Sequence, residues 1–239
     1  DLGLRFSVAP SLLTQLQPYV TAASLANNHS YDFGSAGYAH TQRALAASGV
    51  TPFGHPQRID PPHRITTGAE TVALIGLNQF ATTFTGDDLA TTVRAAQASA
   101  DVVVAYVHWG TEYQVTPSPF QRNLAERLAQ LGVDVIIGHH PHVLQPIERV
   151  GSTVVFYSLG NTVFDQYFSA AVQTGLLVGL ERADGTLGLR LHPVSSIGTP
   201  HQPRVLRDAA RTDALTALAK MSPPSLRAAI ETGFVPLPE

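Results

Sequence analysis

Runs of apolar residues alternate along this chain with segments in which apolar residues recur every three or four positions. The apolar runs predict buried strands at Thr21–Ala26, at Thr71–Leu77, at Asp101–Val107 and in the segments that start at Val133 and Ser152. Helical periodicity predicts helices at Ala36–Ser48, Asp88–Ala100 and Phe120–Leu131. Near-continuous apolar strands separated by helices are typical of α/β proteins whose sheets are covered by helices.

A hairpin is predicted where Leu176–Glu181 and Leu187–His192 flank the turn signal Asp184-Gly185. We therefore expect mixed sheets in a layered α/β sandwich. From Gly198 onward the chain is rich in proline and alanine, with room for one or two short helices. The sequence predicts one domain over residues 1–197 and a C-terminal extension over residues 198–239.

Composition limits the chemistry of any site. The 239 residues carry a formal net charge of -3, which gives no broad basic surface, so we expect no nucleic-acid partner. The absence of cysteine excludes disulfides and thiolate ligands, so any metal must be held by nitrogen and oxygen atoms. No apolar run is long enough to predict a membrane span in this chain.

Polar side chains gather just after the predicted strands. They are Asn27, Asn28, His29 and Asp32 after the first, His108 and Glu112 after another, and then His139, His140, His142 and Asn161. In open α/β sheets, ligands bind in the crevice outside the carboxyl ends of the strands. We therefore expect these side chains to meet in one crevice.

Each motif also has a structural interpretation. Asn27, Asn28 and Asp32 are typical helix-capping and turn residues, and His108 is compatible with a satisfied core histidine. Three imidazoles in the four positions 139–142 repel one another when protonated, and a bound cation would compensate for this. Trp109 fits either a substrate groove or the core. The other histidines, expected at the surface or in structural positions, are His40, His55, His63, His192 and His201.

Four ordered motifs resemble a known family: "SLANNHSYDFGSAGYAHTQRAL", "VHWGTEYQ", "GHHPHVLQPIE" and "YSLGNTVFDQ". Together they resemble the bacterial poly-gamma-glutamate capsule biosynthesis (CapA-type) proteins, within the calcineurin-like metallophosphatase superfamily. The resemblance runs from about Phe6 to about Pro193. It implies a four-layer α/β sandwich and two divalent ions of manganese, iron or zinc at the strand ends in the complete protein.

The resemblance also implies roles for individual residues. The implied metal ligands are Asn28, His108, His140 and His142. His29 would protonate a leaving group or steady the transition state, and Asp32 and Glu112 would orient the site or contact the substrate. Substrate contacts are expected from Asn27, Trp109, His139 and Asn161.

This sequence departs from the superfamily pattern at its start. The superfamily places an aspartate motif and a bridging carboxylate before the Asn-His motif, whereas the only acid before Asn28 here is Asp1. Neutral ligands do not offset the repulsion between two adjacent divalent ions, so this chain by itself should not hold a full two-metal centre. Either it is a fragment lacking its first strands, which we favour because their loss would expose a sheet edge, or it belongs to a metal-free branch.

Three functions follow from these alternatives. The first is a metal-dependent hydrolase acting in the biosynthesis of capsule, poly-gamma-glutamate or another cell-surface polymer. The second is a metal-independent acid–base enzyme such as a peptide epimerase, and the third is a non-catalytic scaffold in a polymer-synthesis or export complex. An anionic polymer or a peptide is the expected partner. The resemblance suggests a cell-surface location, while the sequence itself does not fix the compartment.

Overall fold

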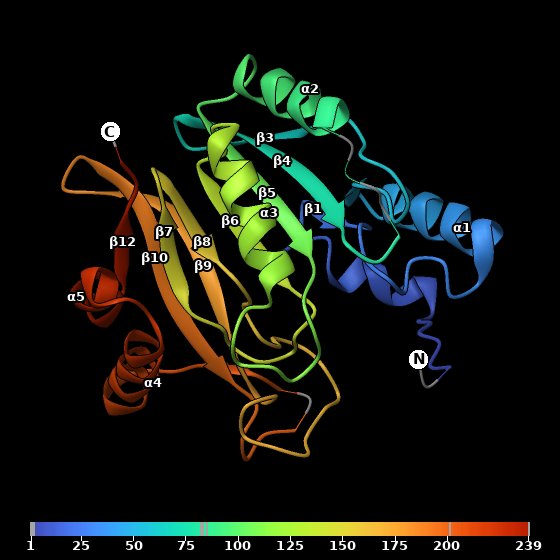
Figure 1. Ribbon diagram of the computed structural model, residues 1–239. Coiled ribbons are helices and arrows are strands. Elements are labelled where there is room, and N and C mark those ends of the chain that lie inside the picture. Colours follow the sequence, from blue (N-terminus) through green and yellow to red (C-terminus); the bar gives the residue numbers. More distant parts are fainter. Residues whose placement is uncertain (1–2, 82–83, 85, 201, 239) are drawn as a thin grey trace. The chain divides into compact units, whose positions relative to one another are not determined.

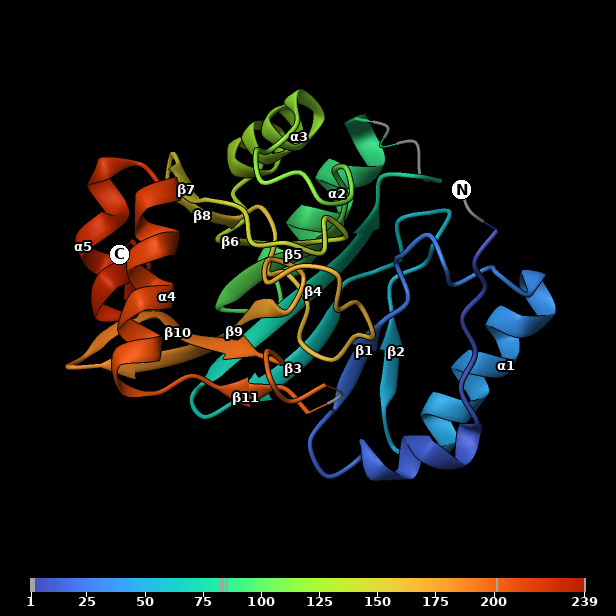
Figure 2. The same ribbon diagram turned by 90° about the horizontal axis from the view of Figure 1, so that it is seen from below.

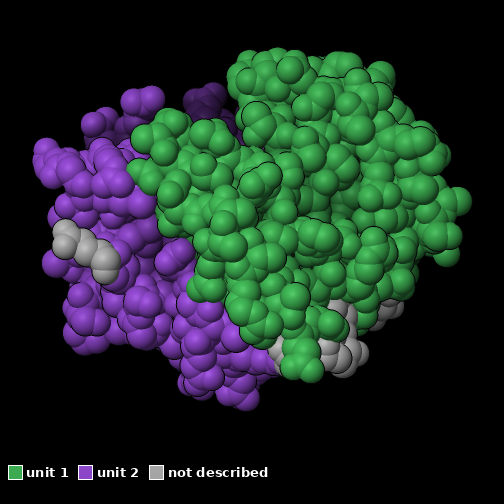
Figure 3. Space-filling model, turned by 90° about the horizontal axis from the view of Figure 1, so that it is seen from above, with its two compact units in different colours: residues 1–108 green, residues 109–239 purple. Residues whose placement is uncertain are grey.

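The computed structural model describes residues 3–81, 84, 86–200 and 202–238 (Figure 1). The chain forms two compact units, residues 1–108 and residues 109–239 (Figure 3). The boundary between the two units lies between His108 and Trp109. The division of the sequence into residues 1–197 and 198–239 stays a prediction.

The first unit holds eight elements in its described residues. They are η1 (Pro10–Gln15), β1 (Ala22–Ser24), α1 (Gly34–Ala47), β2 (Thr51–Phe53), β3 (His63–Thr67), β4 (Glu70–Asn78), α2 (Gly86–Gln97) and β5 (Val102–His108). Strands β1 and β2 pair in parallel. Strand β4 pairs antiparallel with β3 and parallel with β5, so this sheet is mixed as expected.

Close backbone packing joins the strands of this unit. A Cβ atom on Gly76 of β4 would lie 2.8 Å from the Cα of Gly54, so the absence of side chains lets the chain after β2 approach β4. Helix α2 packs on β4 and β5 (Figure 1), and α1 packs beside β2 (Figure 2). A cluster of buried side chains joins α1 to the strand ends: Leu25, Tyr38, Leu45 and Val50. This packing fixes the turn after β1.

The second unit holds the remaining elements. They are α3 (Pro119–Gln130), β6 (Val135–His139), β7 (Ile147–Val150), β8 (Thr153–Phe156), β9 (Thr174–Ala183), β10 (Thr186–Ser195), β11 (Arg204–Val205), α4 (Asp208–Met221), α5 (Pro224–Thr232) and β12 (Phe234–Pro236). Strand β8 pairs in parallel with β6 and antiparallel with β7. Strand β10 pairs antiparallel with β9, β11 and β12, and α4 and α5 lie side by side next to β10 and β12 (Figure 2).

Local sequence signals explain several element ends in this unit. Helix α3 begins with a capping box, in which the Ser118 hydroxyl accepts the Gln121 N–H and the Gln121 side chain accepts the Ser118 N–H. The β9–β10 hairpin turns at Asp184 and Gly185, whose φ angles of 50° and 83° suit a tight two-residue turn.

The predicted α/β class with mixed sheets and covering helices is confirmed. The first strand is shorter than predicted, Ala22–Ser24 in place of Thr21–Ala26. Strands β3 and β7 were not predicted, because each contains charged or exposed positions and so lacks a continuous apolar run. Among the helices that the described residues form, none is both long and apolar enough to cross a membrane.

Gly138 of β6 directly precedes His139, and its close packing leads to a prediction about stability. A methyl group at this position would overlap the Tyr157 carbonyl oxygen and the Trp109 indole nitrogen. We expect Gly138→Ala to lower the free energy of unfolding by about 1–3 kcal/mol through overpacking, measured by urea denaturation. Gly179→Ala is the control, because a Cβ there meets its nearest neighbour, Arg190, at 3.8 Å. Equal losses in both variants would contradict the prediction.

Candidate functional site

The turn that follows β1 is held by its own side chains. The Asn27 side-chain oxygen accepts the backbone N–H of His29 at 2.9 Å, and the Ser30 hydroxyl donates to the Leu25 carbonyl at 2.7 Å. Such Asx-type bonds shape tight turns. The structure gives Asn27 a turn-forming role, and the substrate contact expected of it stays a prediction.

His29 and Asp32 form a hydrogen-bonded pair within this turn. The imidazole Nδ1 lies 3.0 and 3.1 Å from the two carboxylate oxygens of Asp32. The Asp32 side chain is 10% exposed and that of His29 is 33% exposed. A carboxylate beside Nδ1 holds the proton there, which leaves Nε2 as the atom that can exchange a proton with a ligand.

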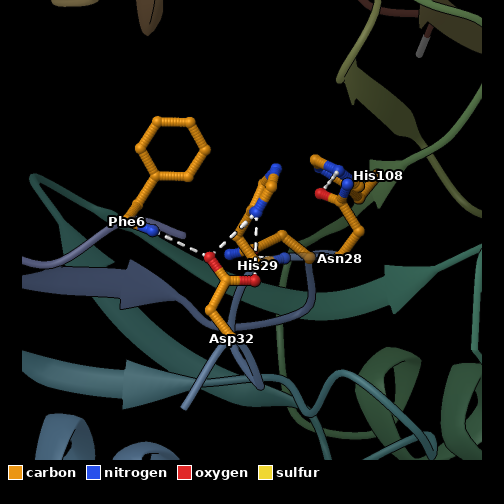
Figure 4. Close-up of polar contacts among 6 residues, drawn as sticks. Phe6, Asn28, His29, Asp32 and His108 are labelled. Atoms are coloured by element: carbon orange, nitrogen blue, oxygen red, sulfur yellow. Dashed lines mark hydrogen bonds and ion pairs between the residues drawn. The ribbon is translucent and has the colours of Figure 1, made fainter. Parts of the chain in front are cut away.

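Phe6 completes the surroundings of this pair (Figure 4). Its backbone N–H donates to the Asp32 Oδ2 at 2.9 Å, and its ring meets the His29 imidazole edge-on with centroids 4.5 Å apart. Asp32 is thus held from two sides. Sequence reasoning missed Phe6, because the polar contact comes from the main chain and carries no signal in the side chain.

Asn28 and His108 come together from distant parts of the first unit (Figure 4). The His108 Nε2 lies 2.8 Å from the Asn28 Oδ1, although 80 positions separate the two residues. Asn28 is exposed on the turn after β1, and His108 is buried at the end of β5. The two atoms that we predicted as metal ligands therefore point at each other.

A second group of donors lies in the second unit. Among the described residues, Glu112, His140 and His142 present one carboxylate oxygen and two ring nitrogens that all lie within 4.8 Å of one another. Ligand atoms about 2.1 Å from a shared ion are at most about 4.2 Å apart, so a small inward movement would let all three reach one ion. Two imidazoles and one carboxylate, without thiolate, suit manganese, iron or zinc. The residues therefore fit a divalent ion.

The backbone at this group is strained. Tyr113, His140 and His142 have φ angles of 63°, 100° and 61°. Residues with a Cβ rarely adopt positive φ, and each such residue costs about 1–3 kcal/mol unless its surroundings hold it. Strain of this kind concentrates where side chains must be aimed for function.

Two other residues near this group were expected to contact substrate. Trp109 is completely buried, stacks on Tyr157 and donates its indole N–H to the Tyr157 carbonyl at 2.8 Å, so it belongs to the core and not to a substrate groove. Burial lowers the pKa of His139 to about 3, with His140 and His142 contributing to the same shift. The substrate contact expected of His139 stays a prediction.

Asn161 has a partner within the group. Its side-chain oxygen lies 2.8 Å from the Nδ1 of His142, so Asn161 accepts a hydrogen bond from the imidazole. A bond of this kind fixes the tautomer of a metal-binding histidine and leaves Nε2 available. Asn161 thus contacts a candidate ligand, and its expected substrate contact stays a prediction.

The structure brings the predicted residues together in two groups, one within each unit. The first contains Asn28, His29, Asp32 and His108, and the second contains Glu112, His140, His142 and Asn161. Their convergence on one crevice stays a prediction. Of the remaining histidines, His55 is buried against Tyr31 and Tyr38 in a structural position, and His201 lies outside the described residues.

The fold and these two groups together describe an α/β protein with a candidate metal centre. Residues 3–166 match the family described as bacterial capsule synthesis protein PGA_cap. The chain belongs to this family, which confirms the resemblance to CapA-type proteins drawn from the four motifs.

Two curated relatives illustrate the family. The PGA biosynthesis protein CapA of Bacillus subtilis (strain 168) is 43% identical over 102 residues, which are 43% of this chain and 27% of the relative. The capsule biosynthesis protein CapA of Bacillus anthracis is 32% identical over 198 residues, which are 73% of this chain and 47% of the relative. The chain thus spans about half the length of these relatives or less.

Among solved structures, a hypothetical protein from Thermus thermophilus is similar with a TM-score of 0.43 and 18% sequence identity. The match covers 79% of this chain and 77% of that chain. The family assignment rests on the sequence comparisons.

Proposed function

We propose that this chain is a metal-dependent hydrolase that acts in the synthesis of bacterial capsule or poly-gamma-glutamate. The observation that carries the proposal is the group of Glu112, His140 and His142, whose ligand atoms lie within 4.8 Å of one another. The names of the relatives support the polymer, because they refer to PGA and capsule biosynthesis.

The charge around this group also supports a metal ion. The segments 110–118, 139–146 and 158–173, which carry the group and its partners, contain no lysine or arginine. The nearby cation Arg122 is paired with Glu148 at 2.9 Å. In these segments, a bound cation would therefore supply the positive charge that attracts an anionic polymer.

Different residues of the chain would bind the metal and transfer the proton. Glu112, His140 and His142 would hold the ion, and Asn28 and His108 remain predicted ligands. When bound, a divalent ion polarises the scissile group and lowers the pKa of water. Asp32 keeps the His29 Nδ1 protonated, so the Nε2 of His29 would give a proton to the leaving group or take one from water.

Removal of metal tests the proposal. We expect treatment with EDTA to lower the hydrolysis of bis(p-nitrophenyl) phosphate and of poly-gamma-glutamate by about 100-fold or more, because a metal supplies several kcal/mol of transition-state stabilisation. Dialysis against manganese, iron or zinc should restore the rate. The measurement is the initial rate in the chelated and reloaded chain, with the metal content determined in parallel.

A second candidate is metal-independent acid–base catalysis on a peptide, favoured by the close pairing of His29 with Asp32. Activity that survives EDTA and is lost in His29→Ala would support it and overturn the hydrolase proposal. Normal polymer synthesis by a His29→Ala, His140→Ala double variant would instead support the non-catalytic scaffold.

A further inference from the structure

A chain of hydrogen-bonded side chains connects the candidate ligand His142 to Tyr113, which directly follows the candidate ligand Glu112, within the second unit. The Asn161 side chain links the His142 Nδ1 at 2.8 Å to the Gln166 Oε1 at 3.2 Å. The Gln166 Nε2 then donates to the Tyr113 hydroxyl at 2.9 Å. Tyr113 directly follows Glu112 along the chain, so these bonds end beside a second candidate ligand.

Amide chemistry gives each bond one direction. An amide oxygen only accepts and an amide NH₂ only donates. The orientation of the Asn161 amide is set independently, because its Nδ2 also donates to the Val172 carbonyl at 3.0 Å. Its oxygen therefore faces His142, which carries a proton on Nδ1; in the neutral imidazole the lone pair is then on Nε2.

The same rule orders the other half of the chain. Gln166 uses its oxygen for Asn161, so its NH₂ group faces the Tyr113 oxygen. The phenolic oxygen of Tyr113 therefore accepts this bond.

We propose that Asn161, Gln166 and Tyr113 are positioning residues that hold His142 in its metal-binding orientation. The inference rests on the metal site of the proposed function. It gives the strained backbone a reason, since Tyr113 and His142 both have positive φ and their side chains are connected through this chain of bonds. Phe164 and Phe168 add ring contacts, with centroids 4.8 Å from His142 and 5.2 Å from Tyr113.

Metal affinity tests the inference. Gln166→Met keeps the length of the side chain but removes both hydrogen bonds without touching a ligand, and Tyr113→Phe removes only the hydroxyl. Each variant should weaken zinc and manganese binding by about 10–100-fold, the usual effect of removing a partner of a metal ligand. Gln130→Met, on the exposed end of α3, is the matched control and should bind like the unaltered chain.

The double variant distinguishes a connected chain from two separate effects. If Tyr113 and Gln166 act in series on His142, the Gln166→Met, Tyr113→Phe variant should bind metal about as weakly as the worse single variant. Independent effects would multiply instead. Multiplied losses would contradict the serial arrangement.

The tautomer of His142 gives a readout in the metal-free chain. Nitrogen NMR should show the Nδ1-protonated form in the unaltered chain and a mixture of the two tautomers in Asn161→Leu. If the unaltered chain binds no metal, the proposed function is wrong. If it binds metal and all three variants bind within about threefold of it, the positioning inference is wrong and the proposed function stands.

Discussion

Replacement of His142 by alanine is expected to abolish the binding of divalent metal and, with it, hydrolysis. His142 supplies one of the three donor atoms in the candidate site, and its loss leaves one imidazole and one carboxylate. Loss of a residue that hydrogen-bonds to a metal ligand lowers metal affinity by about 10–100-fold. Loss of the ligand itself should therefore lower the affinity by more than about 100-fold. The measurement is the dissociation constant for zinc and manganese, with the bound metal counted after gel filtration.

His192→Ala provides the control for this experiment. His192 is exposed on β10 of the same unit, and its replacement makes the same change of side chain at a position outside the candidate site. It should leave metal binding unchanged. Binding also stabilises the folded chain by about 2.7 kcal/mol at a metal concentration 100 times the dissociation constant, so the unaltered chain should gain thermal stability from metal. A His142→Ala variant that keeps this gain would show that the ion binds elsewhere.

His29→Ala is expected to lower kcat by about 10²–10⁴-fold while the metal content stays normal, because a positioned general acid contributes a factor of this size. The dependence on the leaving group makes the test specific. A p-nitrophenolate ion leaves readily without a proton, whereas an alkoxide does not. The loss should therefore be largest for alkyl esters and smallest for p-nitrophenyl esters, measured as kcat on a series of phosphodiesters.

His40→Ala is the matched control, since His40 is exposed on α1 of the same unit. The kcat of Asp32→Asn should lie between those of His29→Ala and the unaltered chain. This variant retains the size of the side chain but replaces a carboxylate that accepts from the His29 Nδ1 at 3.0 Å. An equal loss on all esters in His29→Ala would indicate that His29 acts in some way other than protonation of the leaving group.

Much of the fold could be predicted because its buried strands carry continuous apolar runs. Strand β5 was expected at Asp101–Val107 and spans Val102–His108, a shift of one residue. Strand β7 escaped prediction because Glu148 and Arg149 occupy half of it. Periodicity responds to burial, and an edge strand that is only partly buried does not produce the pattern.

The site could be predicted only where the side chain itself indicates its chemistry. The close spacing of His140 and His142 along the chain was enough to indicate a cation. Glu112 was expected to orient the site or touch substrate, and the structure places its carboxylate among the candidate ligands. The contact between Tyr113 and Gln166 joins positions 53 residues apart. Only the folded backbone brings such ordinary polar residues together.

The hydrogen bond from Phe6 to Asp32 has a consequence for which substitutions position 6 can accept during evolution. The donor is a main-chain N–H, and every amino acid except proline supplies one. Substitution at position 6 can therefore replace the ring beside His29 while the main-chain hydrogen bond to Asp32 is retained. Conservation scores, which compare side chains, would overlook this support. A single proline would remove it at once.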